Sequence, residues 1–100
     1  MIVYMVHVNN DEESFDIPYA NADKAVEALL DDYYVDKVNN WDEDIPDEEA
    51  YKKALDKYSA LIRLETAEMF MRYRQETKEQ GYVRFEIPDY GIVYQTKVVE

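Results

Sequence analysis

Residues 46–81 read PDEEAYKKALDKYSALIRLETAEMFMRYRQETKEQG and predict one long helix. Pro46 is suited to a helix start, and the three acids that follow it suit the positive end of the helix dipole. Apolar side chains then recur at helical spacing, and Gly81 is a typical stop. At up to roughly 34 residues the helix would be about 50 Å long, so we expect a kink or packing of one part on a second copy. The apolar residues between Tyr58 and Tyr73 occupy more than one face, which favours the second copy.

The chain before this helix predicts one or two strands and a shorter helix. Residues 2–8 are β-branched and aromatic on both alternating faces, which is typical of a strand covered on both sides. Residues 15–17 are expected to return as a short edge strand ended by Pro18. Asn21 is expected to be the N-cap of a helix running to about Val38.

The chain after the long helix predicts a β-hairpin. Residues 82–87 and 92–99 alternate as strands around the turn Pro88-Asp89-Tyr90-Gly91. The expected fold is therefore α+β in the order β-α-α-β-β. It has a three- to four-stranded, mostly antiparallel sheet with two helices on one face, and residues 1–100 form a single domain.

The negative charge is concentrated in one part of the chain. The whole sequence carries 23 acids and 11 bases, a net charge of −12. Fifteen of the acids and only two of the bases lie between Asp11 and Glu49, whereas residues 50–100 carry eight acids and nine bases. Such a chain repels nucleic acids and anionic membranes, so direct nucleic-acid binding is excluded as a function.

The sequence offers little for catalysis or for a metal. There is no cysteine, and the single histidine, His7, lies inside the first predicted strand and is interpreted as structural. Two glycines cannot form a phosphate-binding loop, and residues 42–49 do not fit the 12-residue calcium loop because Ile45 and Pro46 interrupt the acids. We predict no enzyme, no cofactor and no metal site. The longest apolar run, residues 1–6, is too short to span a bilayer and lacks the features of a signal peptide, so a cytoplasmic protein is expected.

The acidic segment is where a binding function is predicted. On the first helix Asp23, Glu27 and Asp31 are four residues apart, as are Asp32 and Asp36. Like charges at this spacing cost about 0.2–0.5 kcal/mol per pair, so an uncompensated stripe indicates that a partner uses the charge. Changing Asp31, Asp32 and Asp36 to Asn is expected to slow association without lowering the melting temperature.

Two aromatic residues flanked by acids, Tyr34 and Trp41, are candidates for stacking on an arginine of the partner. Core packing is the equally weighted alternative for both. The full set of predicted partner-binding residues is Asp11, Glu12, Glu13, Asp16, Asp23, Glu27, Asp31, Asp32, Tyr34, Asp36, Trp41, Asp42, Glu43, Asp44, Asp47, Glu48 and Glu49.

Short length, strong acidity, absence of cysteine and acids placed along a helix and its loops together resemble the DNA-mimic inhibitors of phages and mobile elements. These include anti-CRISPR proteins, anti-restriction proteins and uracil-DNA glycosylase inhibitors. The resemblance lies in charge and composition rather than in a motif. It implies a stoichiometric inhibitor that needs no cofactor, occupies the basic DNA- or RNA-binding groove of an enzyme, and works in the host cytosol if phage-encoded.

Two other interpretations stay open. The protein is alternatively a small structural or regulatory interaction protein, for instance a homodimer formed through the long helix, whose acids serve only solubility. A small enzyme or metal-binding domain is the third. Sensitivity to a chelator would favour the third, and light scattering would test the second.

Overall fold

The computed structural model describes residues 1–9 and 14–98 of the chain. Its elements are β1 (Ile2–Asn9), β2 (Ser14–Tyr19), α1 (Ala22–Asn39), α2 (Glu48–Gln80), β3 (Arg84–Ile87) and β4 (Gly91–Lys97). The four strands form one antiparallel sheet in the order β2-β1-β4-β3. The predicted α+β class, the two helices and the antiparallel sheet are confirmed.

The predicted element order is corrected in one detail, because a full strand lies between β1 and α1. Residues 14–19 pair with β1 in a register that sets Tyr19 opposite Tyr4 and Ile17 opposite Val6. Pro18 lacks an N–H group, but β2 is an edge strand, where a missing ladder donor is tolerated. The order is therefore β-β-α-α-β-β rather than β-α-α-β-β.

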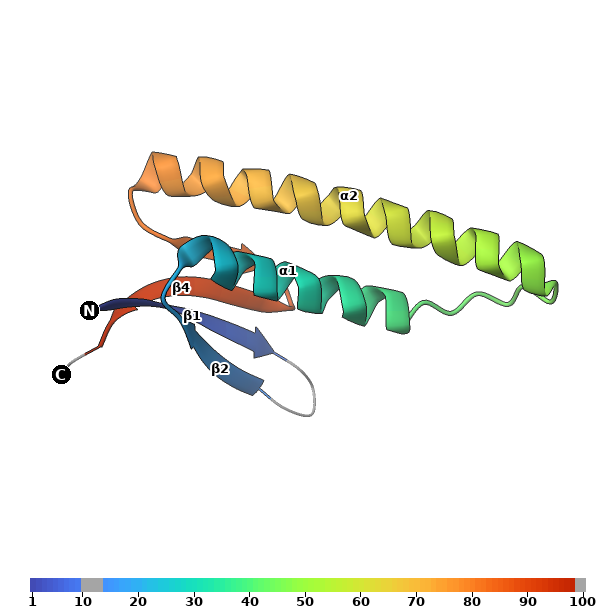
Figure 1. The fold of residues 1–100 in the computed structure, drawn as a ribbon, viewed down its shortest axis with the longest axis horizontal. Coiled ribbons are helices and arrows are strands. Elements are labelled where there is room, and N and C mark those ends of the chain that lie inside the picture. The colour runs from blue at the N-terminus through green and yellow to red at the C-terminus, as the bar shows by residue number, and fades with distance from the viewer. Residues whose placement is uncertain (10–13, 99–100) are drawn as a thin grey trace.

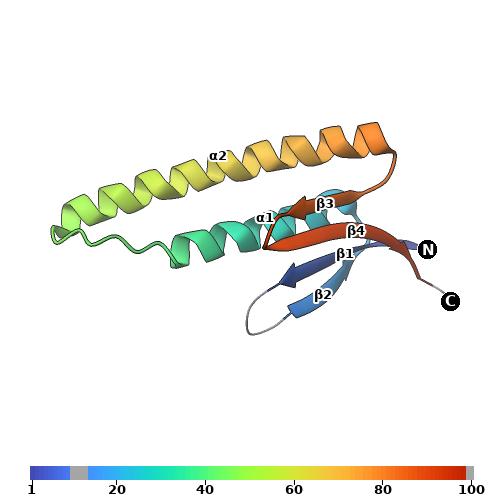
Figure 2. The same cartoon turned by 180° about the vertical axis from the view of Figure 1, so that it is seen from behind.

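Both helices lie on the same face of the sheet (Figure 1). The shorter helix α1 packs over β1, β2 and β4, and α2 packs against α1 and β3; Figure 2 shows β3 on the side of the sheet nearest α2. The prediction that β1 is covered on both sides is wrong. Val6 and Val8 are 3% exposed beneath the helices, whereas Met5 and His7 on the opposite face are only half-buried.

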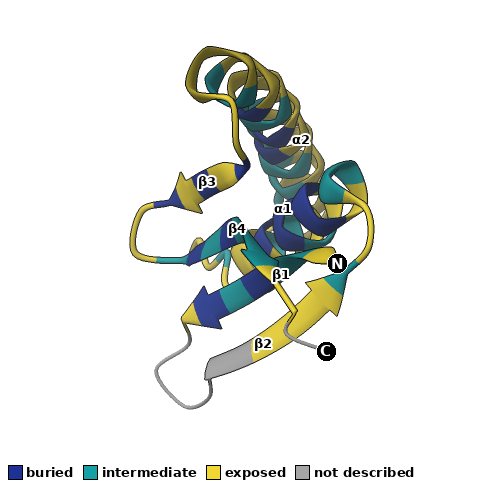
Figure 3. Ribbon diagram, turned by 90° about the vertical axis from the view of Figure 1, so that its left-hand side faces the viewer, coloured by how far each residue is buried: buried dark blue, intermediate teal, exposed yellow. Residues whose placement is uncertain are grey.

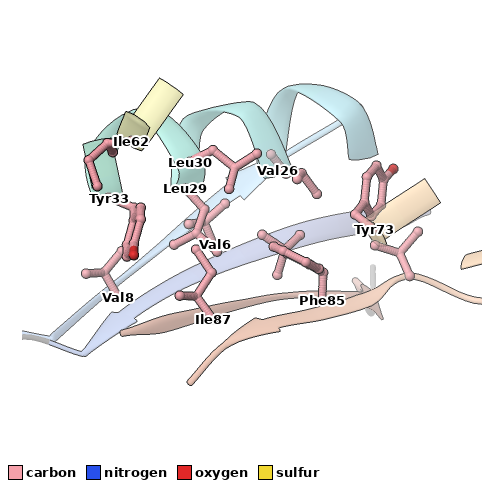
Figure 4. Close-up of a cluster of buried hydrophobic side chains, with 13 residues drawn as sticks. Val6, Val8, Val26, Leu29, Leu30, Tyr33, Ile62, Tyr73, Phe85 and Ile87 are labelled. Carbon is pink, nitrogen blue, oxygen red and sulfur yellow. The ribbon is translucent and has the colours of Figure 1, made fainter. Parts of the chain in front are cut away.

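The core lies between α1 and the sheet and extends to α2 (Figure 4). Its fully buried side chains include Val26 and Leu29 from α1 and Phe85 and Val93 from the hairpin. Gly91 allows the layers to approach closely, since a Cβ atom there would lie 2.7 Å from the His7 carbonyl oxygen and 2.8 Å from Leu29 Cδ1. Glycine is therefore required at the start of β4.

The predicted N-cap Asn21 and the predicted stop Gly81 are confirmed, whereas α2 begins at Glu48 rather than at Pro46, with Asp47 as its N-cap. The Asn21 side chain accepts a hydrogen bond from the Lys24 N–H (3.1 Å), and the Asp47 side chain accepts one from the Glu49 N–H (2.9 Å). Gly81 ends α2 in the left-handed region with φ 81°.

The long helix α2 continues through 33 residues without the kink that its length suggested. It runs antiparallel to α1, and its first turns extend beyond the end of α1 (Figure 1). The molecule is consequently elongated, with extents of 57 × 30 × 19 Å. Neither helix in the described ranges combines the length and the apolar character that crossing a bilayer requires.

Candidate interaction surface

The predicted partner-binding residues do not lie on one surface. Asp11, Glu12 and Glu13 fall outside the described residues. The others occupy three places, which are the outer face of the sheet (Asp16), helix α1, and the loop after α1 with the first turn of α2.

On the outer sheet face Asp16 is paired within the protein. Its Oδ1 atom lies 2.7 Å from Nδ1 of His7, the cross-strand neighbour on β1. This contact orients the imidazole ring, which is half-exposed beside a small pocket of about 300 Å³ next to the β3–β4 turn. The structural interpretation of His7 thus acquires a specific partner, which the sequence did not indicate.

One edge of α1 faces α2, and its carboxylates are engaged there. The Tyr73 hydroxyl donates a hydrogen bond of 2.9 Å to Asp23, and Arg74 lies 3.4 Å from the same carboxylate. Burial, followed by this hydrogen bond, raises the pKa of Tyr73 to about 12. Farther along, Asp31 lies 3.6 Å from Arg63. The charge that looked uncompensated within α1 is therefore partly compensated by α2.

Tyr34 also finds its arginine within the chain. The Arg63 guanidinium carbon lies 3.6 Å from the centroid of the Tyr34 ring, a cation–π geometry. The residue type that the sequence assigned to the partner is thus already present in α2, and Tyr34 is half-buried against it.

The other acids of α1 lie on a different edge. Successive helical residues point about 100° apart, so Asp32 is turned away from Asp31. Asp32 accepts a hydrogen bond from the Tyr90 hydroxyl in the β3–β4 turn, and burial together with this bond raises the pKa of Tyr90 well above its usual range. Asp36 accepts from the Asn40 side chain at 3.0 Å. The acids of α1 therefore form two separate edges instead of one stripe.

The third place is an acidic arm, which we define as residues 41–49. Its six carboxylates belong to Asp42, Glu43, Asp44, Asp47, Glu48 and Glu49. All six residues are exposed, and no base lies among them. Glu48 lies 3.7 Å from Lys52, but both side chains are more than 70% exposed, so this pair contributes little. Asp47 additionally caps α2.

An aromatic cluster attaches this arm to α2. The Trp41 ring centroid lies 5.0 Å from that of Tyr51 and 6.0 Å from that of Tyr58, one and three helical turns into α2. Trp41 and Ile45 are half-buried, whereas the acids around them are exposed. Trp41 thus acts as an anchor for the arm, which agrees with the core-packing alternative more closely than with a free stacking residue.

Several residues that shape this surface were missed at the sequence level. Tyr33 on α1 donates a hydrogen bond of 2.8 Å to Glu65 on α2, and burial followed by this bond raises its pKa to about 12. Together with Tyr73 and Asp23, it ties the two helices in both directions. A buried tyrosine hydroxyl normally requires a partner, so a tyrosine on an apolar helix face was a usable signal for these pairs.

The structure also contains a groove of about 450 Å³ between the two helices. Apolar residues of both helices line it, with Glu27, Asp31 and Arg63 at its rim. Among the residues that the structure describes, His, Asp and Glu side chains form no group of three that could hold a metal ion.

Comparison of the chain with protein-family models, with curated proteins and with solved structures finds no match.

Proposed function

We propose that the protein is an inhibitor that mimics nucleic acid and occupies the basic DNA- or RNA-binding groove of a nucleic-acid-handling enzyme, such as a CRISPR effector or a restriction enzyme. The proposal depends on one observation, the acidic arm. Six exposed carboxylates follow one another there without an intervening base.

The charge density of the arm supports the proposal. From Asp42 to Asp47 the backbone spans at most about 16 Å, and the two helical residues that follow add about 3 Å. Six charges over less than about 20 Å give roughly one charge per 3 Å. One strand of DNA presents a charge every 3.4 Å or so. A groove built for phosphates would therefore meet a similar line of negative charge.

The attachment of the arm supports it further. A free acidic loop would lose conformational entropy on binding, which weakens association. The contacts of Trp41 with Tyr51 and Tyr58 hold the arm against a continuous helix before any partner binds. The arm lies at the end of the long axis opposite the chain's N-terminus (Figure 1), beyond the sheet.

The α1 acids have a smaller role in this proposal than the sequence suggested. Asp23, Asp31 and Asp32 already bind groups of their own chain. A partner would have to replace those contacts, whereas the arm acids are available as they stand. The proposal is therefore narrowed to residues 41–49.

The experiment is a competition assay in which DNA binding by an enzyme is followed at increasing concentrations of this protein. A restriction endonuclease, a CRISPR effector nuclease and uracil-DNA glycosylase form the panel. The test variant is Asp42→Asn/Glu43→Gln/Asp44→Asn. The matched control is Glu68→Gln/Glu79→Gln/Glu86→Gln, which removes the same charge from exposed positions on α2 and β3.

We expect the arm variant to lose on the order of tenfold or more in potency against the responding enzyme, and the control to lose at most about twofold. Inhibition should also weaken steeply as salt rises, because exposed charges are screened within about 10 Å at 0.1 M. Equal losses for the two variants would refute a role for the arm. If the protein inhibits no enzyme of the panel, the proposal that it blocks these classes of enzyme is contradicted.

One observation favours the alternative, a structural or regulatory interaction protein. Leu61, Leu64 and Met71 on α2 are 56%, 64% and 71% exposed. Side chains of this size on one helix indicate a surface that a protein covers. In that case the acids would serve only solubility, and both charge variants would behave like the wild type.

A further inference from the structure

The long helix has a second apolar face, on the side opposite the buried Ile62 and Tyr73, and this face borders the groove between the helices, which Ala67 and Met71 also line. The outer side of α2 is exposed along its length (Figure 3). We define the outer stripe as Ala60, Leu64, Ala67 and Met71, all of which are exposed. Their 4-3-4 spacing repeats every seven residues, the period at which two helices pack along each other.

We propose that the outer stripe binds the outer stripe of a second copy of this chain, with the two α2 helices antiparallel and a twofold axis between Leu64 and Ala67. Side-chain size supports this register. It sets Ala60 opposite the partner's Met71 and Leu64 opposite the partner's Ala67. Each large side chain then meets a small one, as interdigitated helix packing requires.

Charge selects the antiparallel direction. A parallel pair would place the two acidic arms side by side, with six carboxylates in each, on copies that each carry a net charge of −12. It would also place Leu64 against Leu64 and leave Ala67 against Ala67. The antiparallel pair separates the arms to opposite ends of the dimer, because each arm lies at the start of α2 (Figure 1).

In the same register the flanks of the stripe contain one pair of opposite charges and one pair of like charges. Asp56 and Arg74 lie eighteen residues, or five helical turns, apart and so share one edge of the stripe. The antiparallel pair brings Asp56 within one residue, about 1.5 Å along the helix, of the level of the partner's Arg74, whose guanidinium also lies 3.4 Å from Asp23 of its own chain. Lys53 meets the partner's Lys78, a like pair at each end, with Glu79 next to it. The lysine pairs at the two ends of the interface therefore oppose dimerisation weakly, whereas the apolar contacts between them favour it.

The four residues of the stripe span about 16 Å of helix, which is a small interface. We therefore expect a dimer that dissociates on dilution. This inference is independent of the proposed function, since the acidic arm stays exposed in the dimer.

Because the chain has no cysteine, introduced thiols report the register directly. Ala60→Cys and Met71→Cys variants of distinguishable mass are mixed and oxidised under native conditions. The antiparallel dimer predicts a disulfide between the two variants and at least about fivefold less within either variant alone, because identical positions lie about 16 Å apart. Preferential linkage of Ala60→Cys to itself would overturn the antiparallel register.

Light scattering between about 10 μM and 1 mM gives the second readout. The wild type is expected to approach twice the chain mass of 11.9 kDa, and Leu64→Glu is expected to remain a monomer over the same range. The matched control is Val35→Glu, which places the same charge at an apolar α1 residue that is 51% exposed. A wild type that stays monomeric throughout, or equal weakening by both variants, would overturn the proposal.

Discussion

Replacing Asp23 by alanine separates carboxylates that hold the fold from carboxylates that are free to bind a partner. Three losses contribute to its effect. Tyr73 is only 4% exposed, and its hydroxyl would lose its acceptor, which costs about 1–3 kcal/mol. An acid in the first turn of α1 contributes about 0.3–1 kcal/mol through the helix dipole. The ion pair with Arg74 is about half-exposed and contributes at most about 1 kcal/mol.

We therefore expect Asp23→Ala to lower the free energy of unfolding by about 1.5–4 kcal/mol. Urea denaturation followed by circular dichroism measures this difference. The matched control is Glu27→Ala, one turn farther along α1 and exposed, which should change stability by less than about 0.5 kcal/mol. In a double-mutant cycle, Asp23→Ala should cost at least about 1 kcal/mol less when Tyr73 is already phenylalanine.

Equal losses of stability in Asp23→Ala and Glu27→Ala would contradict this prediction, because both carboxylates would then simply face solvent. Additive effects of Asp23→Ala and Tyr73→Phe on the free energy of unfolding would contradict it as well, because the Tyr73 hydroxyl would then not depend on the Asp23 carboxylate. The same logic revises the sequence-level expectation for Asp31, Asp32 and Asp36. Their replacement by Asn should lower the melting temperature, because Arg63 and Tyr90 would lose charged partners.

Three further predictions concern the packing, the arm and the response to pH. The methyl group of Gly91→Ala overlaps the β1 backbone, so this substitution should lower the free energy of unfolding by more than about 2 kcal/mol. The methyl group of Gly81→Ala meets no atom within 4 Å, so this substitution should cost about 1 kcal/mol, from the positive φ alone. Urea titration measures both values. Trp41→Ala should speed amide hydrogen exchange in the arm while lowering global stability by less than about 2 kcal/mol. The folded state raises the pKa of Tyr33 and of Tyr73 to about 12, because it favours their neutral hydroxyls. Each tyrosine should therefore contribute about 2–3 kcal/mol to stability below pH 10, and this contribution should be lost as pH rises from 10 through 12. Thermal melts across this pH range measure the loss.

Each of these predictions has its own control. Equal effects of the two glycine substitutions would contradict the close approach at the start of β4. Unchanged exchange in the arm after Trp41→Ala would show that the aromatic contacts do not hold it. For pH, a Tyr33→Phe/Tyr73→Phe variant should lose stability less steeply above pH 10 than a Tyr82→Phe variant, because Tyr82 is 47% exposed. Identical slopes would contradict the two buried tyrosine–carboxylate bonds.

The features that the sequence predicted correctly are local ones. Asn21 and Gly81 act through hydrogen bonds and backbone angles within a few residues, so their types and positions indicate where helices begin and end. The hairpin turn at residues 88–91 is local in the same way. The second strand was underestimated because Pro18 argues against a strand, and its compatibility with an edge depends on the sheet order, which is not a local property.

The features that the sequence missed are contacts between distant residues. Asp23 and Arg74 lie 51 positions apart, and Asp32 and Tyr90 lie 58 apart. Helical periodicity indicates which face of α1 is buried, but it does not indicate which residues of α2 lie beside which residues of α1. Arg63 illustrates this, since its position between Tyr34 and Asp31 depends on that level alone.

This distinction changes what an uncompensated acidic stripe signifies. Judged within α1 alone, three acids at successive turns repel one another, and a partner appears necessary to explain them. In the folded chain, Arg63 and Arg74 of α2 supply the opposite charge at two of the three positions. The acids of α1 therefore do not require a partner. The acidic arm is different, because within the described residues its six carboxylates share one ion pair, Glu48 with Lys52, and the aromatic contacts of Trp41 keep them in place without neutralising them.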